Sequence, residues 1–314
     1  SWTQKGSILY QSSTSLASES SGSNNSFGYS VSINSTGDII AIGENAYESQ
    51  TNVNNSISTL GAVHIFQYDG NDWIQMGNSL VGSGHNAGFG AIVKLSSDGL
   101  TLFSSSMRWP SNAYTGKVEI YTYNSSNTTW ELKGNAIEGG ESGERFAGYS
   151  MDITSNGLTF AASSFFYKNA EDVVVGAAKV YTYNAVDNSF NQVGQTLYGT
   201  DANNKIQYIA LSDDGTVLVT ARSVDNTIES NAGTIIVYKY DGTSWNQMGQ
   251  PIYATNENDF AGYNNTIACN VDGSQILIGA QTDENYTDTG SVSLYEYDGT
   301  NWNLVSILHG TRQN

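Results

Sequence analysis

The sequence has few of the residues that crosslink a chain or bind metals. Among 314 residues it holds one cysteine, two prolines and three histidines. The lone Cys269 excludes an internal disulfide framework, and no His-x-x-x-His or Cys-x-x-Cys spacing offers a metal site. With so few prolines and no stretch of helical periodicity, we expect almost no helix. The chain should therefore be a fold of strands and turns.

Basic residues are also scarce, with twelve Lys and Arg against thirty Asp and Glu and a formal net charge of −18. A surface of that sign repels the phosphates of nucleic acids and the head groups of anionic lipids. No apolar run reaches the roughly 18 residues that a membrane span requires. We therefore expect no nucleic-acid partner and no membrane insertion.

One unit of roughly sixty residues is repeated five times along the chain. Its clearest mark is a motif that begins with an aromatic residue and, in most copies, ends in glycine, as in Trp73-Ile74-Gln75-Met76-Gly77. The motif recurs at residues 130–134, 190–194, 245–249 and, in decayed form, 302–306. A sixth copy, Trp2-Thr3-Gln4-Lys5-Gly6, has no unit before it.

Each unit predicts four strands, which we name a to d. Strand a alternates apolar and polar residues, as at Val31 and Ile33, which is typical of a strand with one buried face. It ends in a tight turn with glycine that returns the chain as strand b. Strand b ends in a small residue, such as Gly43, which predicts a close approach of neighbouring backbone. Cys269 takes a strand a position that other units fill with Ile or Leu, so we expect it to be buried.

Antiparallel strands repeated in fours are the sequence pattern of a β-propeller, in which each sheet is a blade. We predict an all-β fold of five four-stranded antiparallel blades in one domain, residues 1–314, with a surplus strand over residues 1–10. The predicted units are 11–80, 81–137, 138–197, 198–252 and 253–308. Part of a six- or seven-bladed ring would show the same repeats, and that alternative stays open.

Two motifs in this pattern resemble a known family. Phe27-Gly28 at the start of strand a and Ala41-Ile42-Gly43-Glu44-Asn45 at the end of strand b are similar to the FG-GAP repeat of integrin-α-type propellers. The whole unit more closely resembles the propeller repeats of marine bacteria and large algal viruses. This resemblance implies a fold and not an activity. Integrin-type repeats often bind calcium between strands a and b, but here that loop is a tight turn, as at residues 212–215, with too few oxygens for the ion.

The links from b to c and from d to a are long, and the longest span residues 8–26 and 44–60. Loops of this kind on a rigid scaffold often carry binding groups. Exposed aromatic rings in two adjacent units are the candidate ligand-binding residues, since sugars and protein partners stack on such rings. They are Trp109, Phe165, Phe166 and Tyr167. The alternative is that these rings pack on their own loops.

Acidic residues in the same loops are a weaker candidate for a metal site. Asp283, Glu284 and Asp288, or Glu171 with Asp172, have the oxygen ligands that calcium prefers. The alternative is a solvated acidic loop, and we expect no other cofactor.

Catalytic groups are hard to assemble from this sequence. His64 falls within strand c, His85 and His309 lie elsewhere, and Cys269 takes a core position, so we expect no enzyme. We predict a non-enzymatic structural or adhesive propeller, extracellular or on a cell or virion surface. It would contact a protein partner or another copy through the long-loop face or a terminal strand, which can add to a sheet edge. The alternative is a carbohydrate-binding, lectin-like propeller.

Overall fold

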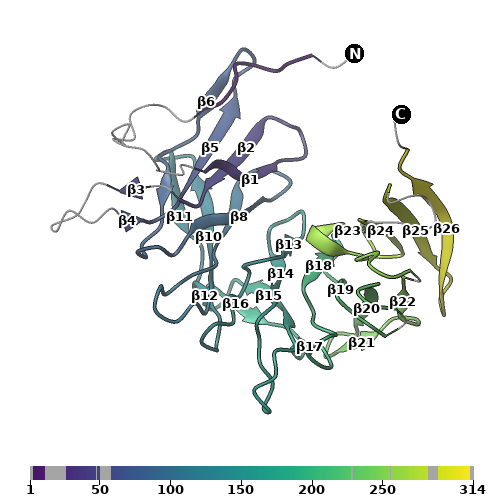
Figure 1. Ribbon diagram of the computed structural model, residues 1–314. Coiled ribbons are helices and arrows are strands. Elements are labelled where there is room, and N and C mark those ends of the chain that lie inside the picture. The colour runs from purple at the N-terminus through teal and green to yellow at the C-terminus, as the bar shows by residue number, and fades with distance from the viewer. Residues whose placement is uncertain are drawn as a thin grey trace, which may run out of the picture. The chain divides into compact units, whose positions relative to one another are not determined.

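The computed structural model describes residues 3–10, 26–46, 48–49, 58–227, 229–254, 256–281 and 289–311 (Figure 1). Five antiparallel sheets follow one another along this part of the chain, and its one helical element is the 3-10 turn Tyr263–Asn265. The prediction of an all-β fold with five four-stranded antiparallel propeller blades is confirmed. No helix among these residues is long and apolar enough to cross a bilayer.

The four strands of each blade are neighbours in the sheet in the same order as in the chain. Blade 1 contains β1 (Phe27–Ile33), β2 (Ile39–Glu44), β5 (Ala62–Tyr68) and β6 (Trp73–Gln75). Blade 2 contains β8 (Phe89–Leu95), β9 (Thr101–Ser106), β10 (Lys117–Asn124) and β11 (Thr129–Leu132). Blade 3 contains β13 (Met151–Ile153), β14 (Thr159–Ser164), β15 (Ala177–Asn184) and β16 (Ser189–Gln192). Blade 4 contains β18 (Tyr208–Leu211), β19 (Val217–Arg222), β20 (Thr234–Tyr240) and β21 (Trp245–Gln247). Blade 5 contains β23 (Ile267–Cys269), β24 (Gln275–Ala280), β25 (Ser291–Tyr297) and β26 (Trp302–His309).

Blades 1 to 4 each have a short extra strand that the sequence did not predict. After the outer strand the chain turns at a glycine and pairs a second time with strand c of its own blade. These strands are β7 (Leu80–Val81), β12 (Ile137–Glu138), β17 (Leu197–Tyr198) and β22 (Ile252–Tyr253). In blade 5, β26 continues without a break along β25 instead, with a register shift between Leu294 and Tyr295. Two further strands, β3 (Glu48–Ser49) and β4 (Ser58–Thr59), pair with each other.

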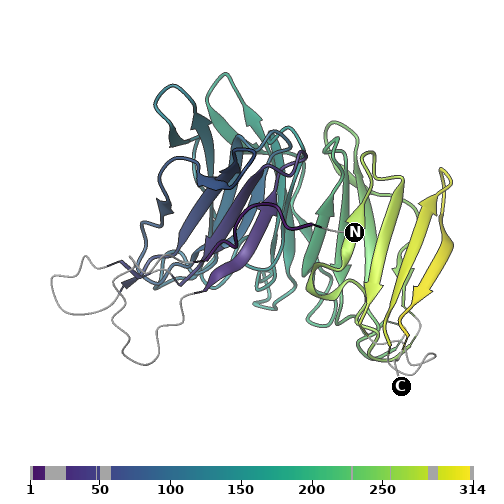
Figure 2. The ribbon, with the colours of Figure 1, turned by 90° about the horizontal axis from the view of Figure 1, so that it is seen from above.

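The chain forms two compact units. The first comprises residues 1–148, 155–157 and 185–189, and the second comprises 149–154, 158–184 and 190–314. Blades 1 and 2 lie in the first unit, and blades 3 to 5 make up most of the second. Within each unit the sheets stack face against face (Figure 2).

The core of the first unit lies between blades 1 and 2. Val63 and Ile65 of blade 1 pack with Val93 and Leu95 of blade 2, and all four are at most 7% exposed. The indole Nε1–H of Trp130 in blade 2 donates to the carbonyl oxygen of Met76 in blade 1 at 2.9 Å. The aromatic residue that marks the repeat therefore joins one blade to the one before it.

The second unit repeats this junction between blades 3, 4 and 5. Trp245 Nε1–H donates to the Val193 carbonyl oxygen at 3.0 Å, and Trp302 Nε1–H to the Met248 carbonyl oxygen at 2.8 Å. Both indoles are buried among residues of the neighbouring blade. Stacking thus covers the apolar sheet faces that a single blade leaves open.

The described part of the predicted N-terminal strand is not a strand. Residues 3–10 form no ladder, because a strand exists only where another strand pairs with it, and Trp2 lies outside the described residues. The segment is nevertheless fixed on blade 1, where Trp73 Nε1–H donates to the Lys5 carbonyl oxygen at 2.9 Å.

Adding one methyl group between blades 1 and 2 should destabilise the protein strongly. Gly61 has φ +81°, and a Cβ there would meet the Phe89 carbonyl oxygen at 2.1 Å. We expect Gly61→Ala to lower the free energy of unfolding, measured in urea, by about 2 to 4 kcal/mol. Gly70 is the matched control, because its φ is +102° and a Cβ there meets nothing within 4 Å. Gly70→Ala should lower the free energy of unfolding by roughly 1 kcal/mol. Equal losses of stability in the two variants would contradict the close packing of Gly61 on Phe89.

Acid should weaken the turns between strands c and d. The pKa of Asp241 is lowered by hydrogen bonds from the backbone N–H groups of Ser244 and Thr243, and that of Asp298 by bonds from Asn301, the Asn303 side chain and Thr300. A lowered pKa in the folded state gives stability above the unfolded pKa of about 4, and that stability is lost as the pH falls through the folded value.

The double variant Asp241→Asn, Asp298→Asn should therefore lose less stability on acidification than the wild type does. Melting temperatures recorded from pH 6 down to about pH 2.5 would show this as a shallower fall. Parallel curves for the two proteins would mean that these carboxylates do not contribute.

Candidate functional site

Trp109, one of the predicted ligand-binding residues, packs over a buried lysine. It follows β9 and is half-buried. Its ring lies 3.8 Å from Lys117 Nζ, and its Nε1–H donates to Glu138 Oε1 at 3.1 Å. Lys117 also forms an ion pair with Glu119 at 3.0 Å. These contacts agree with the alternative that Trp109 packs within its own blade, while its ligand-binding role stays a prediction.

The other three predicted aromatic residues follow β14 in the second unit and pack on rings of their own unit. The Phe165 and Phe166 ring centroids are 4.7 Å apart, and both rings contact Tyr149. Tyr167 contacts Tyr198, with centroids 5.2 Å apart. All three are half-buried, and their ligand-binding role likewise stays a prediction.

The described residues do not bring the predicted metal-ligating residues together into a site. Asp283, Glu284 and Asp288 lie outside the described residues. In the other loop, Lys168 Nζ and Asp172 Oδ1 form an ion pair at 2.7 Å. Within the described ranges, no three His, Cys, Asp or Glu side chains come close enough to share an ion.

Three residues of blade 1 that the sequence did not point to form a connected chain of hydrogen bonds. His64 Nε2 lies 3.0 Å from Glu44 Oε2, and His64 Nδ1 lies 2.8 Å from the Ser79 hydroxyl oxygen. The Glu44 side chain has no exposed surface, and that of His64 is 16% exposed. We call Glu44, His64 and Ser79 the blade 1 triad.

Strand pairing brings the blade 1 triad together. Glu44 ends β2, where it pairs with Ala62 of β5, and His64 follows two residues later on the same face of that strand. Ser79 precedes β7, which pairs back along β5 through Val63. Phe27 of the FG motif packs on the imidazole ring with its centroid 5.5 Å away, which restrains the ring.

In the neutral imidazole, the partners fix which nitrogen donates and which accepts. The Glu44 carboxylate only accepts, so His64 Nε2–H is the donor to it and Nδ1 is left as an acceptor. Because Nδ1 then accepts, the Ser79 hydroxyl donates to it at 2.8 Å, and the Ser79 oxygen accepts from Gln75 Nε2 at 3.0 Å. This is the arrangement of a hydroxyl next to a general base that a carboxylate orients.

The triad departs from the repeat, since the register assigns other residues to its three positions in blades 2 to 5. The equivalents of Glu44, His64 and Ser79 are, in order, Ser106, Glu119 and Ala136; Ser164, Lys179 and Thr196; Arg222, Ile236 and Pro251; and Ala280, Ser293 and Ile307. A comparison of the units position by position could have found it, once the short fifth strand was known.

The second unit has a cavity at the three repeat positions that the triad takes in blade 1. The blade 5 equivalents Ala280, Ser293 and Ile307 line a cavity of about 310 Å³, whose other wall includes Tyr253 and Asp259 from the end of blade 4 and the loop that follows it. Stacked blades thus leave room for a small molecule next to these three positions.

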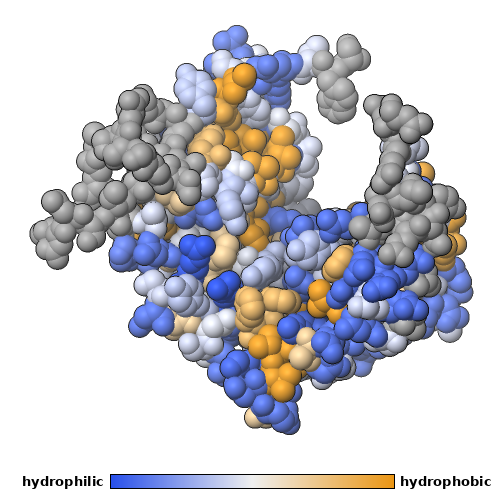
Figure 3. All heavy atoms as spheres, viewed as in Figure 1, coloured by the Kyte–Doolittle hydropathy of each residue, from blue (hydrophilic) through white to orange (hydrophobic). Residues whose placement is uncertain are grey.

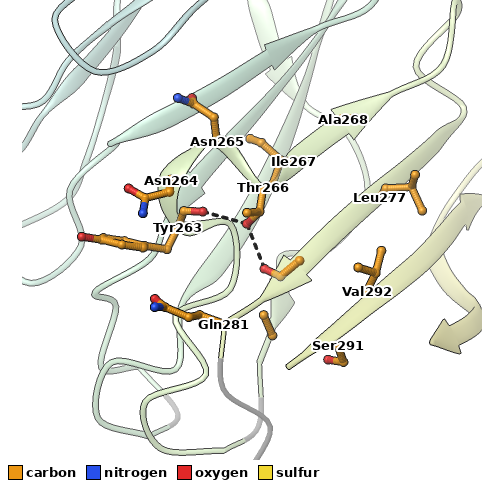
Figure 4. A pocket seen from close by; sticks show the side chains of 12 residues that line it. Tyr263, Asn264, Asn265, Thr266, Ile267, Ala268, Leu277, Gln281, Ser291 and Val292 are labelled. Atoms are coloured by element: carbon orange, nitrogen blue, oxygen red, sulfur yellow. Dashed lines mark hydrogen bonds between the residues drawn. The ribbon is translucent and has the colours of Figure 1, made fainter. Parts of the chain in front are cut away.

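A second hollow, of about 570 Å³, lies on one face of blade 5 and holds no charged side chain among its lining residues (Figure 4). Leu277 and Val292 lie on one side of it, and the Thr266 hydroxyl donates to the Tyr263 carbonyl oxygen on the other. Leu277 and Val292 correspond to Ala41 and Val63, which blade 2 covers in the first unit. This hollow therefore lies on the blade 5 face that corresponds to the blade 1 face packed against blade 2.

No family model matches the chain, and no curated protein matches it. Many solved structures are similar to it. A protein of Bacteroides uniformis provisionally named a 6-phosphogluconolactonase is 11% identical with a TM-score of 0.56, over 90% of this chain and 72% of that one. A Pseudomonas aeruginosa periplasmic gluconolactonase is 13% identical with a TM-score of 0.50, over 89% and 71%. Saccharomyces cerevisiae Sqt1 is 13% identical with a TM-score of 0.54, over 91% and 64%.

These likenesses show the propeller fold. The predicted function, a non-enzymatic structural or adhesive propeller, is contradicted by them. Three of the similar structures carry the names of lactonases, which are enzymes. The same names weaken the prediction that the protein is not an enzyme. The resemblance to FG-GAP repeats stays a prediction, since none of these names refers to such repeats.

Cys269, which we predicted to be buried, is only half-buried, but its thiol should still react slowly in the folded protein. Burial, together with the carboxylates of Asp152 and Asp214, raises the pKa of its thiol to about 12. Because the thiolate is the reactive form, we expect a disulfide reagent at pH 8 to modify the folded protein at least roughly 100-fold more slowly than the urea-unfolded protein. Equal rates, followed by thiol absorbance, would show that the thiol is accessible and ionised.

Proposed function

We propose that the protein is a serine hydrolase that cleaves esters at the blade 1 triad. The observation that carries this proposal is the unbroken chain from Ser79 through His64 to Glu44, with heavy-atom separations of 2.8 and 3.0 Å. Both distances lie within the range for a nucleophile beside its base and a base beside its orienting group.

The triad can perform both halves of an ester hydrolysis. Ser79 Oγ attacks the carbonyl carbon while His64 Nδ1 takes its proton, and the bond to the alcohol oxygen then breaks as His64 returns the proton to that oxygen. Water next enters by the reverse route and releases the acid from Ser79. Glu44 holds the imidazole in the required tautomer and stabilises its positive charge in each transition state.

The burial of Glu44 supports a role beyond packing. A carboxylate without exposed surface is costly unless its partners compensate for the lost hydration. The four other blades fill this position with Ser, Arg or Ala, so the repeat itself does not require an acid there. Its stabilisation of a protonated His64 is stronger in a dry site than in water.

A small cyclic ester of a sugar acid is the substrate class to test first. The names of the similar lactonase structures suggest it. The cavity of about 310 Å³ at the equivalent position in blade 5 is at the lower end of the usual size of ligand sites. A net charge of −18 disfavours phosphorylated substrates, so we propose an uncharged lactone.

We further propose that the protein acts outside the cytoplasm, in an extracellular or surface location. Its acidic composition with a single cysteine supports this, as does the name of the similar periplasmic gluconolactonase.

Replacement of the proposed nucleophile should abolish hydrolysis without unfolding the protein. We expect Ser79→Ala to lower kcat/KM for glucono-δ-lactone and for p-nitrophenyl acetate by roughly 1,000-fold. Thr196→Ala is the matched control, because Thr196 takes the same repeat position in blade 3 and accepts a similar bond, from Gln192 Nε2 at 3.2 Å. It should keep full activity. A wild-type protein inactive on both esters, or an Ser79→Ala variant as active as the wild type, would refute the proposal.

A further inference from the structure

The N-terminal residues Gln4–Ser7 lie on blade 1 as the outer strand of one blade lies on the next. In the repeat, Lys5 is the counterpart of Met76. The Lys5 carbonyl oxygen accepts the indole N–H of Trp73 at 2.9 Å, as the Met76 oxygen accepts that of Trp130 at 2.9 Å. The segment thus makes the contact that joins blades elsewhere in the chain.

Two further contacts repeat in the same way. The Gln4 side-chain amide donates to the Gly6 carbonyl oxygen at 2.8 Å, as that of Gln247 donates to Gly249 at 2.9 Å. A Cβ on Gly6 would lie 2.8 Å from Trp73 Cδ1, and Gly249 is equally close to its own neighbouring indole. The local geometry is therefore that of an outer strand, although no other strand of a blade accompanies it among the described residues.

The segment is held on blade 1 by charge as well. Lys5 Nζ donates to the Gly37 carbonyl oxygen at 2.8 Å and lies 4.5 Å from the centroid of the Tyr68 ring. The Ser7 N–H donates to Asp72 Oδ1 at 2.7 Å. Gln4–Ser7 are thus in place before any partner binds.

The sheet face beside this segment is apolar, and nothing described in the first unit covers it. Tyr29, Val31 and Ile33 are 54%, 63% and 56% exposed. Their counterparts in blade 2, which blade 1 covers, are 3%, 2% and 7% exposed, and these are Ala91, Val93 and Leu95. Apolar side chains gather over β1 and β2 on the surface seen in Figure 3.

We propose that Gln4–Ser7 are the outer strand of a further blade, and that the open face of β1, β2 and β5 binds the three inner strands of that blade. The partner is a three-stranded antiparallel sheet of this same repeat that lacks its own outer strand. Toward blade 1 it presents apolar residues at the positions of Ala41, Val63 and Ile65, and a small one at that of Gly43.

A complete blade does not fit this place. Blade 5 has its own outer strand, β26, in which Val305 takes the position of Met76. If a second copy stacked blade 5 on blade 1, the Val305 carbonyl would compete with Lys5 for the Trp73 indole. The docked segment therefore selects a partner sheet without an outer strand.

The bound sheet would also complete the triad's surroundings. Between blades 4 and 5 the counterparts of the triad line a cavity whose second wall comes from the end of blade 4 and the loop that follows it. On blade 1 the inner strands of the partner would supply the part of that wall that Ile235 of β20 supplies in blade 4. This inference concerns binding and stands whether or not the triad hydrolyses esters.

The test mixes the full chain with a shortened version, residues 8–300. The shortened version lacks β26, so its blade 5 has only three strands, and it lacks the N-terminal segment Gln4–Ser7. We expect a 1:1 complex of the two in sedimentation velocity at about 50 μM, a concentration at which micromolar affinity gives mostly complex. The full chain with Ser79→Ala should bind equally, which separates this proposal from the hydrolase. Absence of a complex with folded 8–300 would overturn it.

Two variants of the full chain give the controls. Val31→Lys with Ile33→Lys places two charges on the open face and should reduce complex formation by at least roughly 100-fold. Val186→Lys, at a side chain that is 96% exposed in a blade 3 turn, should leave it unchanged. Loss of the complex in both variants, or in neither, would contradict binding through this face.

A swap within the intact chain decides the matter if residues 8–300 do not fold. Leu304→Gln, Val305→Lys and Ser306→Gly together give β26 the N-terminal motif. If that motif is an outer strand, the variant should fold with a melting temperature within about 8 °C of the wild type, since roughly 1 to 2 kcal/mol moves it by about 2 to 8 °C in a large domain. A variant that fails to fold would show that the motif cannot serve as an outer strand.

Discussion

The structure depends on the burial of each blade's faces against its neighbours. A four-stranded sheet leaves two broad surfaces open, and only another blade of matching shape covers them. Between blades 1 and 2 the Trp130 indole N–H donates to the Met76 carbonyl oxygen. Glycine lets the two backbones approach closely there, because a Cβ added to Gly43 would lie only 2.2 Å from the Gly90 carbonyl oxygen. Packing this close allows little variation, so one pattern recurs along the chain.

Functional groups can arise only where this pattern tolerates a departure from it. The positions of Glu44, His64 and Ser79 are such a place, because stacked blades leave a cavity there in the second unit. Other blades put different side chains at these positions and keep the fold. Blade 1 combines an acid, an imidazole and a hydroxyl, and backbone pairing sets their distances. The rigid repeat thus supplies the preorganisation that the proposed catalytic role of these residues needs.

The sequence predicted the blades well because turns and alternation are local signals. The glycine turns and the aromatic motif placed the four main strands of each blade. The short strand β7 was missed, since it depends on a pairing with β5 that follows the turn at Gly77. The triad was missed for the same reason: His64 lies 20 residues from Glu44 and 15 from Ser79, and only the register of three strands brings them together. Residues 1–10 were predicted to be a strand, but the described part has the side-chain contacts of one without the pairing.

The central claim is that Ser79 is a nucleophile activated by His64. Mass spectrometry after treatment with a fluorophosphonate, which reacts only with activated hydroxyls, tests it directly. The account predicts one adduct, located on the peptide that contains Ser79, and its loss in His64→Gln although the serine is still present. An unmodified wild-type protein, or an adduct on Ser79 that persists in His64→Gln, would contradict it.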